Sequence, residues 1–543
     1  MKVQYPRTTA YINGKIITID PQDTVAQAML VGGDRILAVG TTKEILEIAP
    51  SYAEIVDLEN RTVVPGIVDS HVHVEMAVTN LELGLSIECP KVSTIQQLLD
   101  AIEQRAKTMK PGEWLIVRGP NVMDAKLVEK RLPTIEELDR VSPNNPCSVW
   151  AAAHYAVLNT LAIKEKGWWH EAKLPMAATM ARDPVTGKAT GKYSEIWDVD
   201  GILNPWDDVS VKEALARGIP KYFTKYGITS VLELSYTTRC VKMYQELLNE
   251  GRLPLRMKVF LQHPQEMLID KVLEMGLCRN MGNNFLSFGG IKLFADGVMG
   301  HANGFAFDDV KWTQEELNEI VLKAHLADYQ IVTHTLSPTG IEMAIAAYEN
   351  ALRVRPKKDH RMRMEHAADR WNRTINGKPF LSDEQKDRIR KAGIMQVPTP
   401  QFIYAFPDRP GVPMRTMMNE GFIIPGASDT TASQPESSNP WHSIWCLVKR
   451  ENMYGKVHTP QECLSILEAL RVFTLWGAYG FFDENIKGSL EPGKLADFCI
   501  LDRDILTCDV DAIRETKVDV TVVGNEVKYE SGAFKLNIGG NSR

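Results

Sequence analysis

The 543-residue sequence lacks several features that mark specialised classes of protein. Its eight cysteines are scattered and form no CxxC pair, which argues against a disulfide scaffold and against a cysteine-rich zinc site. No uninterrupted run of 18 apolar residues is present, so the sequence predicts no membrane-spanning helix. The first residues lack the apolar segment of a secretory signal. We therefore expect a protein of the reducing cytoplasm.

The sequence also has little excess charge of either sign. Its 62 Lys and Arg residues against 69 Asp and Glu residues give a net charge of −7, with no block of basic residues. A nucleic-acid binder usually presents a basic face, so this class is not expected. Apolar residues make up 44% and charged residues 24%, which is typical of globular proteins with a large core.

Both ends of the chain contain short strand patterns separated by turns. Residues 10–65 carry Asn-Gly and Gly-Gly turns between apolar residues, and a Gly-Asn turn occurs near the C-terminus. Isolated hairpins of this size are marginally stable. The two ends therefore predict one small composite β-sandwich, built from residues 1–65 and 485–543.

The middle of the chain, residues 66–484, alternates short apolar strands with helical patterns. This alternation implies parallel strands with right-handed crossovers, and eight repeats predict an α/β protein with a (β/α)8 TIM barrel. The eight candidate strands are residues 66–74, 227–235, 255–262, 290–297, 330–337, 361–367, 394–400 and 422–430. The stretch between the first and second candidate strands is too long for one strand–helix unit, so we expect an insertion after the first strand, within about residues 75–225.

Six side chains that suit a metal site occur at or near the carboxyl ends of these strands. His71 and His73 are two residues apart, so they face the same way on a strand. The others are Lys292, His334, His366 and Asp429. Active sites of such barrels lie at this end of the sheet. Each residue alone is compatible with a core, turn or surface role, but the six together predict a shared metal site.

Imidazoles and carboxylates suit Zn²⁺, with Mn, Fe and Co as alternatives. A catalytic metal activates water, and Asp429 could take a proton from that water and pass it to a departing nitrogen. Lys292 fits beside a cation only as a neutral amine, which could add CO2 and form a carbamate that bridges two metals. The alternative is a one-metal site in which Lys292 is an electrostatic or substrate contact.

With these residues, the sequence resembles the amidohydrolase superfamily, and more closely its family 3 branch of YtcJ-like proteins. The matching segments are VPGIVDSHVH, AAAHYAVLNTLAI, KLFADG, RMEHA, GASDT and SLEPGKLADFCILD. The resemblance implies that the six residues form a two-metal site with Asp429 as both ligand and base. It also implies that His154 lies on the substrate side, where it could polarise a carbonyl. The alternative for His154 is a packed residue of the insertion.

The resemblance further implies hydrolysis of the C–N bond of an amide, N-acyl or N-formyl group in a small-molecule substrate by a metal-activated hydroxide. The sequence departs from the branch after KLFADG, where it continues as VMGHANGF. Asp296 and His301, in and after this segment, either line the site or structure the loop. Tryptophans of the insertion, together with Trp441, His442 and Trp445, either wall an apolar pocket or fill a core.

Three other functions stay open at this point. A deaminase or cyclic-amide hydrolase would use the same residues on another leaving group, and a metal-dependent decarboxylase would use the same metal. A catalytically silent binding protein would not need both the full ligand set and Asp429. We expect no nucleic-acid or membrane partner and, from the general frequency of symmetric oligomers, a homodimer.

Overall fold

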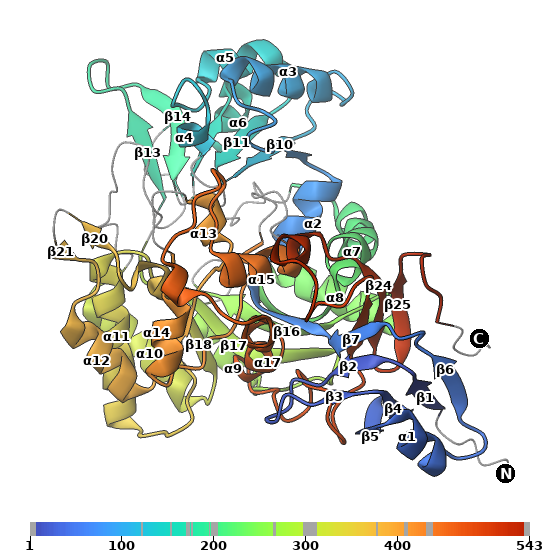
Figure 1. Ribbon diagram of the computed structural model, residues 1–543. Helices are drawn as coiled ribbons and strands as arrows, with labels where there is room; N and C mark the ends of the chain where they lie inside the picture. Colours follow the sequence, from blue (N-terminus) through green and yellow to red (C-terminus); the bar gives the residue numbers. More distant parts are fainter. Residues whose placement is uncertain are drawn as a thin grey trace.

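The computed structural model describes residues 7–120, 123–151, 155–169, 174, 178–194, 196, 205–263, 268–296, 312–375, 378–406, 411–430 and 438–536. A barrel occupies the middle of the molecule, a pair of sheets from both chain ends lies at one side, and a separate lobe lies above the barrel (Figure 1). No helix in the described part of the chain combines the length and the apolar character that crossing a bilayer requires.

The barrel sheet has seven parallel strands in the order β22-β19-β18-β17-β16-β15-β8. They are β8 (Ile67–Val72), β15 (Ile228–Ser235), β16 (Arg256–Gln262), β17 (Leu286–Phe294), β18 (Gln330–His334), β19 (Arg363–Glu365) and β22 (Met395–Val397). These are the first seven strands that the sequence predicts, in the predicted order. The barrel prediction is therefore confirmed, with a sheet that is nearly closed.

The eighth predicted strand, residues 422–430, has no regular strand geometry. Asp429 has a left-handed backbone with φ of 51°, which an extended strand does not accommodate. The segment nevertheless follows the free edge of β8. The amide of Asp429 donates to the carbonyl of His71 at 2.9 Å, and the amide of His73 donates to the carbonyl of Thr430 at 3.2 Å. These bonds hold Asp429 beside both histidines.

Side chains alternate between the inside and the outside of the barrel. Val68, Leu232, Leu234, Phe260 and Val332 form a buried cluster with residues of the 478–481 segment. Because residues two apart on a strand face the same way, this cluster identifies the inward positions of four strands. On β16 and β18 the next inward positions toward the carboxyl ends carry Gln262 and His334, which belong to the site described below. On β8 an irregularity in the pairing with β15, between Asp69 and Val72, breaks the alternation and turns His71 toward the site.

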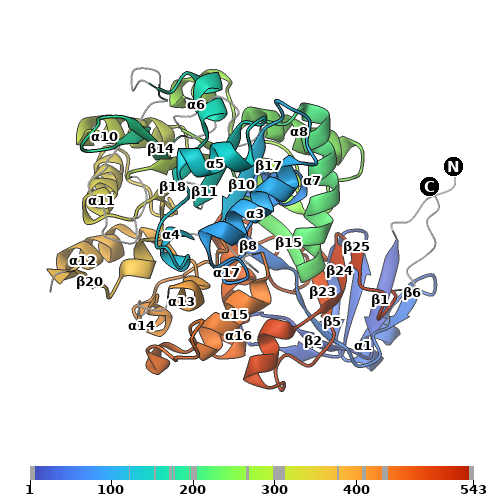
Figure 2. The same cartoon turned by 90° about the horizontal axis from the view of Figure 1, so that it is seen from above.

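Helices cover the outside of the barrel (Figure 2). They include α8 (Thr238–Asn249), α10 (Gln314–Leu326), α11 (Pro338–Val354), α12 (Asp383–Ala392) and α15 (Pro440–Lys449). Thr313 begins α10 with a capping box, in which its hydroxyl accepts from the amide of Glu316 and the Glu316 carboxylate accepts from the amide of Thr313. Ser382 and Gln385 form the same arrangement at the start of α12.

Both chain ends form two adjoining sheets. One has the order β5-β4-β1-β6 and the other the order β25-β24-β23-β7-β2-β3. Their strands are β1 (Thr8–Ile12), β2 (Lys15–Ile17), β3 (Val25–Ala26), β4 (Ala28–Gly32), β5 (Arg35–Gly40), β6 (Glu54–Asp57), β7 (Thr62–Pro65), β23 (Phe498–Leu501), β24 (Val518–Val523) and β25 (Glu526–Glu530). β7 pairs with β23, so the N-terminal and C-terminal segments share one sheet.

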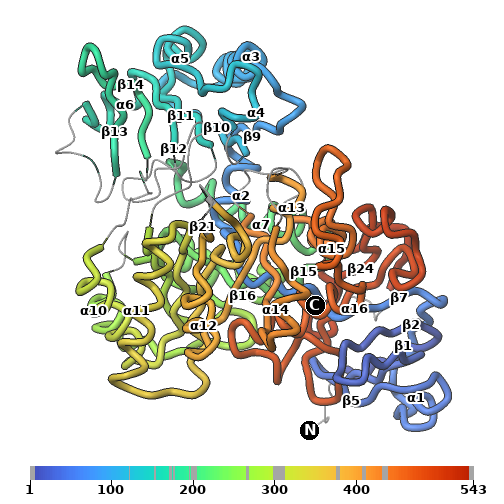
Figure 3. The backbone as a smooth tube through the Cα atoms, turned by 60° about the vertical axis from the view of Figure 1, so that its left-hand side comes forward, coloured from blue at the N-terminus to red at the C-terminus, as the bar shows by residue number. Residues whose placement is uncertain are grey.

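The lobe lies between α2 (Val74–Glu82) and α7 (Asp208–Tyr222) in the chain (Figure 3). Its sheet has the order β13-β14-β12-β11-β10-β9. The strands are β9 (Leu85–Ser86), β10 (Leu115–Gly119), β11 (Cys147–Ala151), β12 (Tyr155–Leu158), β13 (Thr179–Arg182) and β14 (Ala189–Ser194). Trp168 is buried in a core of this lobe, and Trp441 and Trp445 are buried in the main core. These three tryptophans therefore fill cores and do not wall a pocket.

Candidate metal centre

Three potential metal ligands meet at the carboxyl end of β8. The Nε2 atoms of His71 and His73 lie 3.4 and 3.5 Å from Oδ1 of Asp429. Two ligand atoms bound at about 2.0–2.1 Å to one tetrahedral zinc ion lie about 3.3 Å apart, so this spacing fits a shared cation. The side chains of His71 and His73 are 1% and 5% exposed and that of Asp429 is 19% exposed. The group is therefore reached from the side of Asp429.

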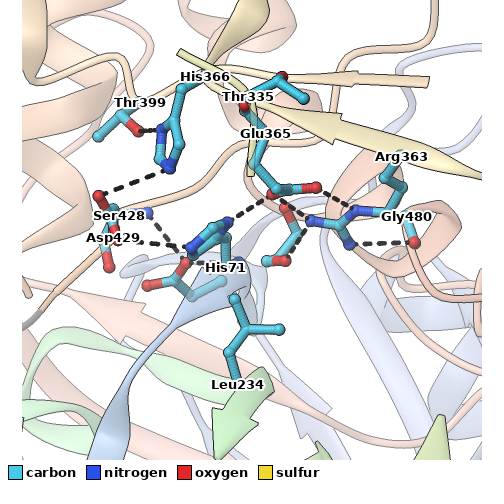
Figure 4. Close-up of polar contacts among 12 residues, drawn as sticks. His71, Leu234, Thr335, Arg363, Glu365, His366, Thr399, Ser428, Asp429 and Gly480 are labelled. Carbon is cyan, nitrogen blue, oxygen red and sulfur yellow. Dashed lines mark hydrogen bonds and ion pairs between the residues drawn. The ribbon is translucent and has the colours of Figure 1, made fainter. Parts of the chain in front are cut away.

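His366 and His334 extend this group of imidazoles along the barrel mouth. Nε2 of His366 lies 3.9 Å from Oδ2 of Asp429, the carboxylate oxygen that does not face His71 and His73. The ring centroids of His366 and His334 are 5.0 Å apart. Asp429 thus presents Oδ1 to His71 and His73 and Oδ2 to His366; the contacts with His71 and His366 are visible in Figure 4. A carboxylate placed in this way can belong to two neighbouring cation positions.

Lys292 lies on β17 with 1% of its surface exposed. Burial lowers the pKa of its amine to about 8, although the carboxylates of Glu365 and Asp429 act in the opposite direction. A fraction of this amine on the order of one tenth is then neutral at pH 7. Only the neutral form can react with CO2, so the surroundings of Lys292 permit the carbamate that the sequence suggests.

Two of the imidazoles, His73 and His366, are in the form that binds metal. Burial lowers the pKa of His73 to about 4 and that of His366 to about 3, so both rings are neutral at pH 7. Burial alone would raise the pKa of Asp429, but its close contacts with His71 and His73 hold that pKa well below the usual range. Neutral nitrogens and an ionised carboxylate are the donors that a divalent cation of the zinc type requires.

Sequence reasoning missed the pair that orients His71. Nδ1 of His71 lies 2.5 Å from Oε2 of Glu365. Arg363 donates through Nε and Nη2 to the two oxygens of that carboxylate, each at 2.9 Å. Because Nδ1 donates to Glu365, Nε2 carries the free lone pair and faces Asp429. The available signal was the spacing of Arg363 and Glu365, which puts both side chains on the inward face of one strand beside His366.

A second missed residue is Gln262, at the end of β16. It is paired in register with Lys292, and Phe260, two residues earlier, lies in the cluster inside the barrel. Gln262 therefore faces the site from the strand next to that of Lys292. The residue is 2% exposed, and neither atom of its carboxamide forms a hydrogen bond with any residue that the structure describes. A buried amide in this state costs roughly 1–3 kcal/mol, a cost that a bound group could offset.

Asp296 stabilises the backbone of a neighbouring turn. Its carboxylate accepts from the amides of Leu336 and Ser337 and from the hydroxyl of Ser337, at 2.6–3.1 Å. These bonds fix the turn that leads from β18 into α11. Oδ1 of Asp296 also lies 3.9 Å from Nε2 of His334. The other two predicted substrate contacts, His154 and His301, lie outside the described residues.

Comparisons with known proteins agree with this arrangement. Residues 54–529 match the family model described as the amidohydrolase family. The N-substituted formamide deformylase of Arthrobacter pascens is 27% identical, with 96% of this chain and 98% of that protein covered. The putative amidohydrolase YtcJ of Bacillus subtilis (strain 168) is 24% identical, with 92% and 97% covered. The crystal structure of an uncharacterized metal-dependent hydrolase from Pyrococcus horikoshii OT3 has a TM-score of 0.71 at 22% identity, with 93% and 99% covered, and shows the same fold.

Proposed function

This chain belongs to the amidohydrolase family, and we propose that it is a metal-dependent hydrolase that cleaves the C–N bond of an amide, N-acyl or N-formyl group in a small molecule. The observation that carries the proposal is the convergence of His71, His73 and Asp429 at 3.4–3.5 Å. The similarity to a protein named N-substituted formamide deformylase, along almost the whole length of both chains, supports the choice of bond.

His71, His73 and Asp429 would hold one divalent cation, His334 and His366 would complete a second position, and a carboxylated Lys292 would serve both. A bound cation supplies Lewis-acid chemistry, which activates water and polarises a carbonyl group. Zinc is the first choice from the donor atoms, with manganese, iron and cobalt as alternatives. The neutral amine of Lys292 would add to CO2 with loss of one proton, which gives an anionic carbamate suited to two cations.

Asp429 is the residue placed to move protons. It is the most exposed of the three converging side chains, and its Oδ2 is the oxygen directed away from His71 and His73. Oδ2 can accept the proton of the attacking water and return it to the departing nitrogen, which must leave as a neutral amine. Glu365 keeps His71 in the tautomer that leaves Nε2 free, and therefore acts as a positioning residue.

The proposal is tested with N-formyl and N-acetyl aryl amines, by measuring release of both amine and acid. The metal-loaded protein should hydrolyse at least one of these compounds, and a strong chelator should abolish the reaction until metal is restored. Asp429→Asn should lower turnover by at least about 100-fold, because the proton acceptor is lost. Asp383→Asn, on the fully exposed start of α12, is the matched control and should be fully active.

Two outcomes would overturn the proposal. The first is a chelated protein or an Asp429→Asn variant that keeps the wild-type rate. The second is a different product: ammonia would indicate a deaminase, and CO2 would indicate a decarboxylase.

A further inference from the structure

A cavity of about 450 Å³ lies between the lobe and the mouth of the barrel. Two of its lining residues lie on segments that continue from metal-centre residues, and a third is hydrogen-bonded to one of these segments. Leu81 belongs to α2, which begins immediately after His73, and Thr430 immediately follows Asp429. Gln401 donates a hydrogen bond to the carbonyl of Ser428, the residue that precedes Asp429. The cavity therefore adjoins the segment that carries Asp429.

The size and the rings of this cavity suit a small organic molecule. Ligand pockets typically enclose about 300–1,000 Å³ and are lined by apolar and aromatic side chains with a few polar groups. Here Tyr222, Tyr226 and Tyr404 supply rings, and Pro90 and Met453 supply apolar surface. A substituent of the substrate that contains a ring or a branched apolar chain would fit these walls.

The charged groups of the lining do not cancel. Its ionic residues are Glu88, Lys91 and Lys126, and Glu88 forms an ion pair with Lys91. Lys126, at the end of α4 (Met123–Lys126), forms no hydrogen bond or ion pair with any residue in the described part of the chain. Burial lowers the pKa of its amine, since no carboxylate compensates for the loss of water. Burial also lowers the pKa of His442 in the same lining to about 4, so that ring adds no charge at pH 7.

We propose that this cavity binds the substituent of the scissile amide and that Lys126 binds a carboxylate on that substituent. The substrate class is then N-formyl or N-acyl compounds that carry both a carboxylate and an aromatic or other apolar group. This inference rests on the proposed function and specifies the substrate of the same site. A carboxylate beside Lys126 would form a charge-assisted hydrogen bond, the stronger kind in a partly buried cavity.

The test uses two compounds that differ only in the carboxylate: N-formylphenylalanine and N-formylphenethylamine. Wild-type kcat/KM should be about 10- to 100-fold higher for the compound with the carboxylate. In Lys126→Met this preference should disappear through a rise in KM, while the rate with N-formylphenethylamine stays within about threefold of wild type. Lys126→Arg keeps the charge and should keep part of the preference. Lys271→Met, an exposed lysine of α9 (Ile269–Glu274), is the matched control.

Two results would overturn the inference: equal wild-type rates with both compounds, or a Lys126→Met variant that loses both activities equally. If neither compound is hydrolysed, the proposed reaction is refuted but the carboxylate site is not. Calorimetric measurement of the binding of the two compounds then tests the cavity on its own. Tighter binding of the carboxylate compound by wild type but not by Lys126→Met supports the inference. Equal binding of both compounds by both proteins refutes it.

Discussion

Replacing Glu365 by Gln should weaken metal binding through the tautomer of His71. One carboxylate now accepts from Nδ1 of His71 and from two nitrogens of Arg363. A carboxamide has one acceptor oxygen, and its NH2 group must face a donor on the other side. When the oxygen faces Nε of Arg363, the NH2 group faces His71, whose proton then moves to Nε2. That nitrogen is the one that faces Asp429, so the histidine loses its free lone pair where the metal needs it.

The size of the effect follows from these contacts. Loss of a carboxylate that orients a metal-bound histidine typically costs 10- to 100-fold in metal affinity, or about 1.4–2.7 kcal/mol. Arg363 has no exposed side-chain surface, and it keeps its bonds to the carbonyls of Ser70 and Gly480. Removing one charge of a buried pair costs about 3–5 kcal/mol of folding free energy. Because Gln retains one acceptor, we expect about 3 kcal/mol, the low end of this range.

Both quantities can be measured on purified protein. Metal affinity is obtained by competition with a coloured chelator, and the free energy of unfolding of the metal-free protein by urea titration. Glu349→Gln is the matched control, since Glu349 also accepts two bonds from one arginine, Arg388, but on a helix surface. The control should change both quantities by less than about 1 kcal/mol. A folded Glu365→Gln variant with wild-type metal affinity would refute the role of Glu365.

Three further predictions concern buried polar groups. Gln262→Leu should raise the free energy of unfolding of the metal-free protein by about 1–3 kcal/mol and lower turnover. Gln330→Leu removes an amide that donates to two carbonyl groups, so it should lower the free energy of unfolding by a similar amount. Equal effects of the two substitutions in urea titrations would contradict the interpretation of Gln262 as a buried amide without partners among the described residues. Asp497→Ala should lower the free energy of unfolding by about 3–5 kcal/mol, because it leaves the buried guanidinium of Arg256 without its carboxylate. A decrease below about 1 kcal/mol would be inconsistent with an ion pair that joins the barrel to the C-terminal strands. Burial raises the pKa of Glu233 to about 8. The folded chain therefore binds more protons than the unfolded chain between about pH 4.5 and 8, and its free energy of unfolding falls as the pH rises through this window. Glu233→Gln should flatten this dependence of the free energy of unfolding on pH, and an unchanged dependence would argue against a protonated Glu233.

Regular strand–helix alternation made most of the barrel predictable. Seven strands follow the predicted segments because each is a short apolar run between helix patterns with clear ends. The segment at 422–430 is not a regular strand; it contains Pro425 and Gly426, and its backbone turns left-handed at Asp429. A backbone angle of this kind depends on hydrogen bonds to β8, which are contacts distant in the sequence that residue patterns do not reveal.

The site was predictable to the extent that its residues are chemically distinctive. His71, His73 and Asp429 stand out by residue type and by position at strand ends, and the structure brings them together. Glu365 and Gln262 did not stand out, since their roles depend on inward-facing neighbours on adjacent strands. The lone charge of Lys126 was also hidden, because it depends on which carboxylates lie near it in space.

The most direct test of the central claim is the anomalous scattering of metal in crystals of the purified, metal-loaded protein. The account predicts a peak within bonding distance of Nε2 of His71, Nε2 of His73 and a carboxylate oxygen of Asp429. It would be contradicted by an active crystal form in which this position has no peak, or in which the only ordered metal lies elsewhere on the molecule.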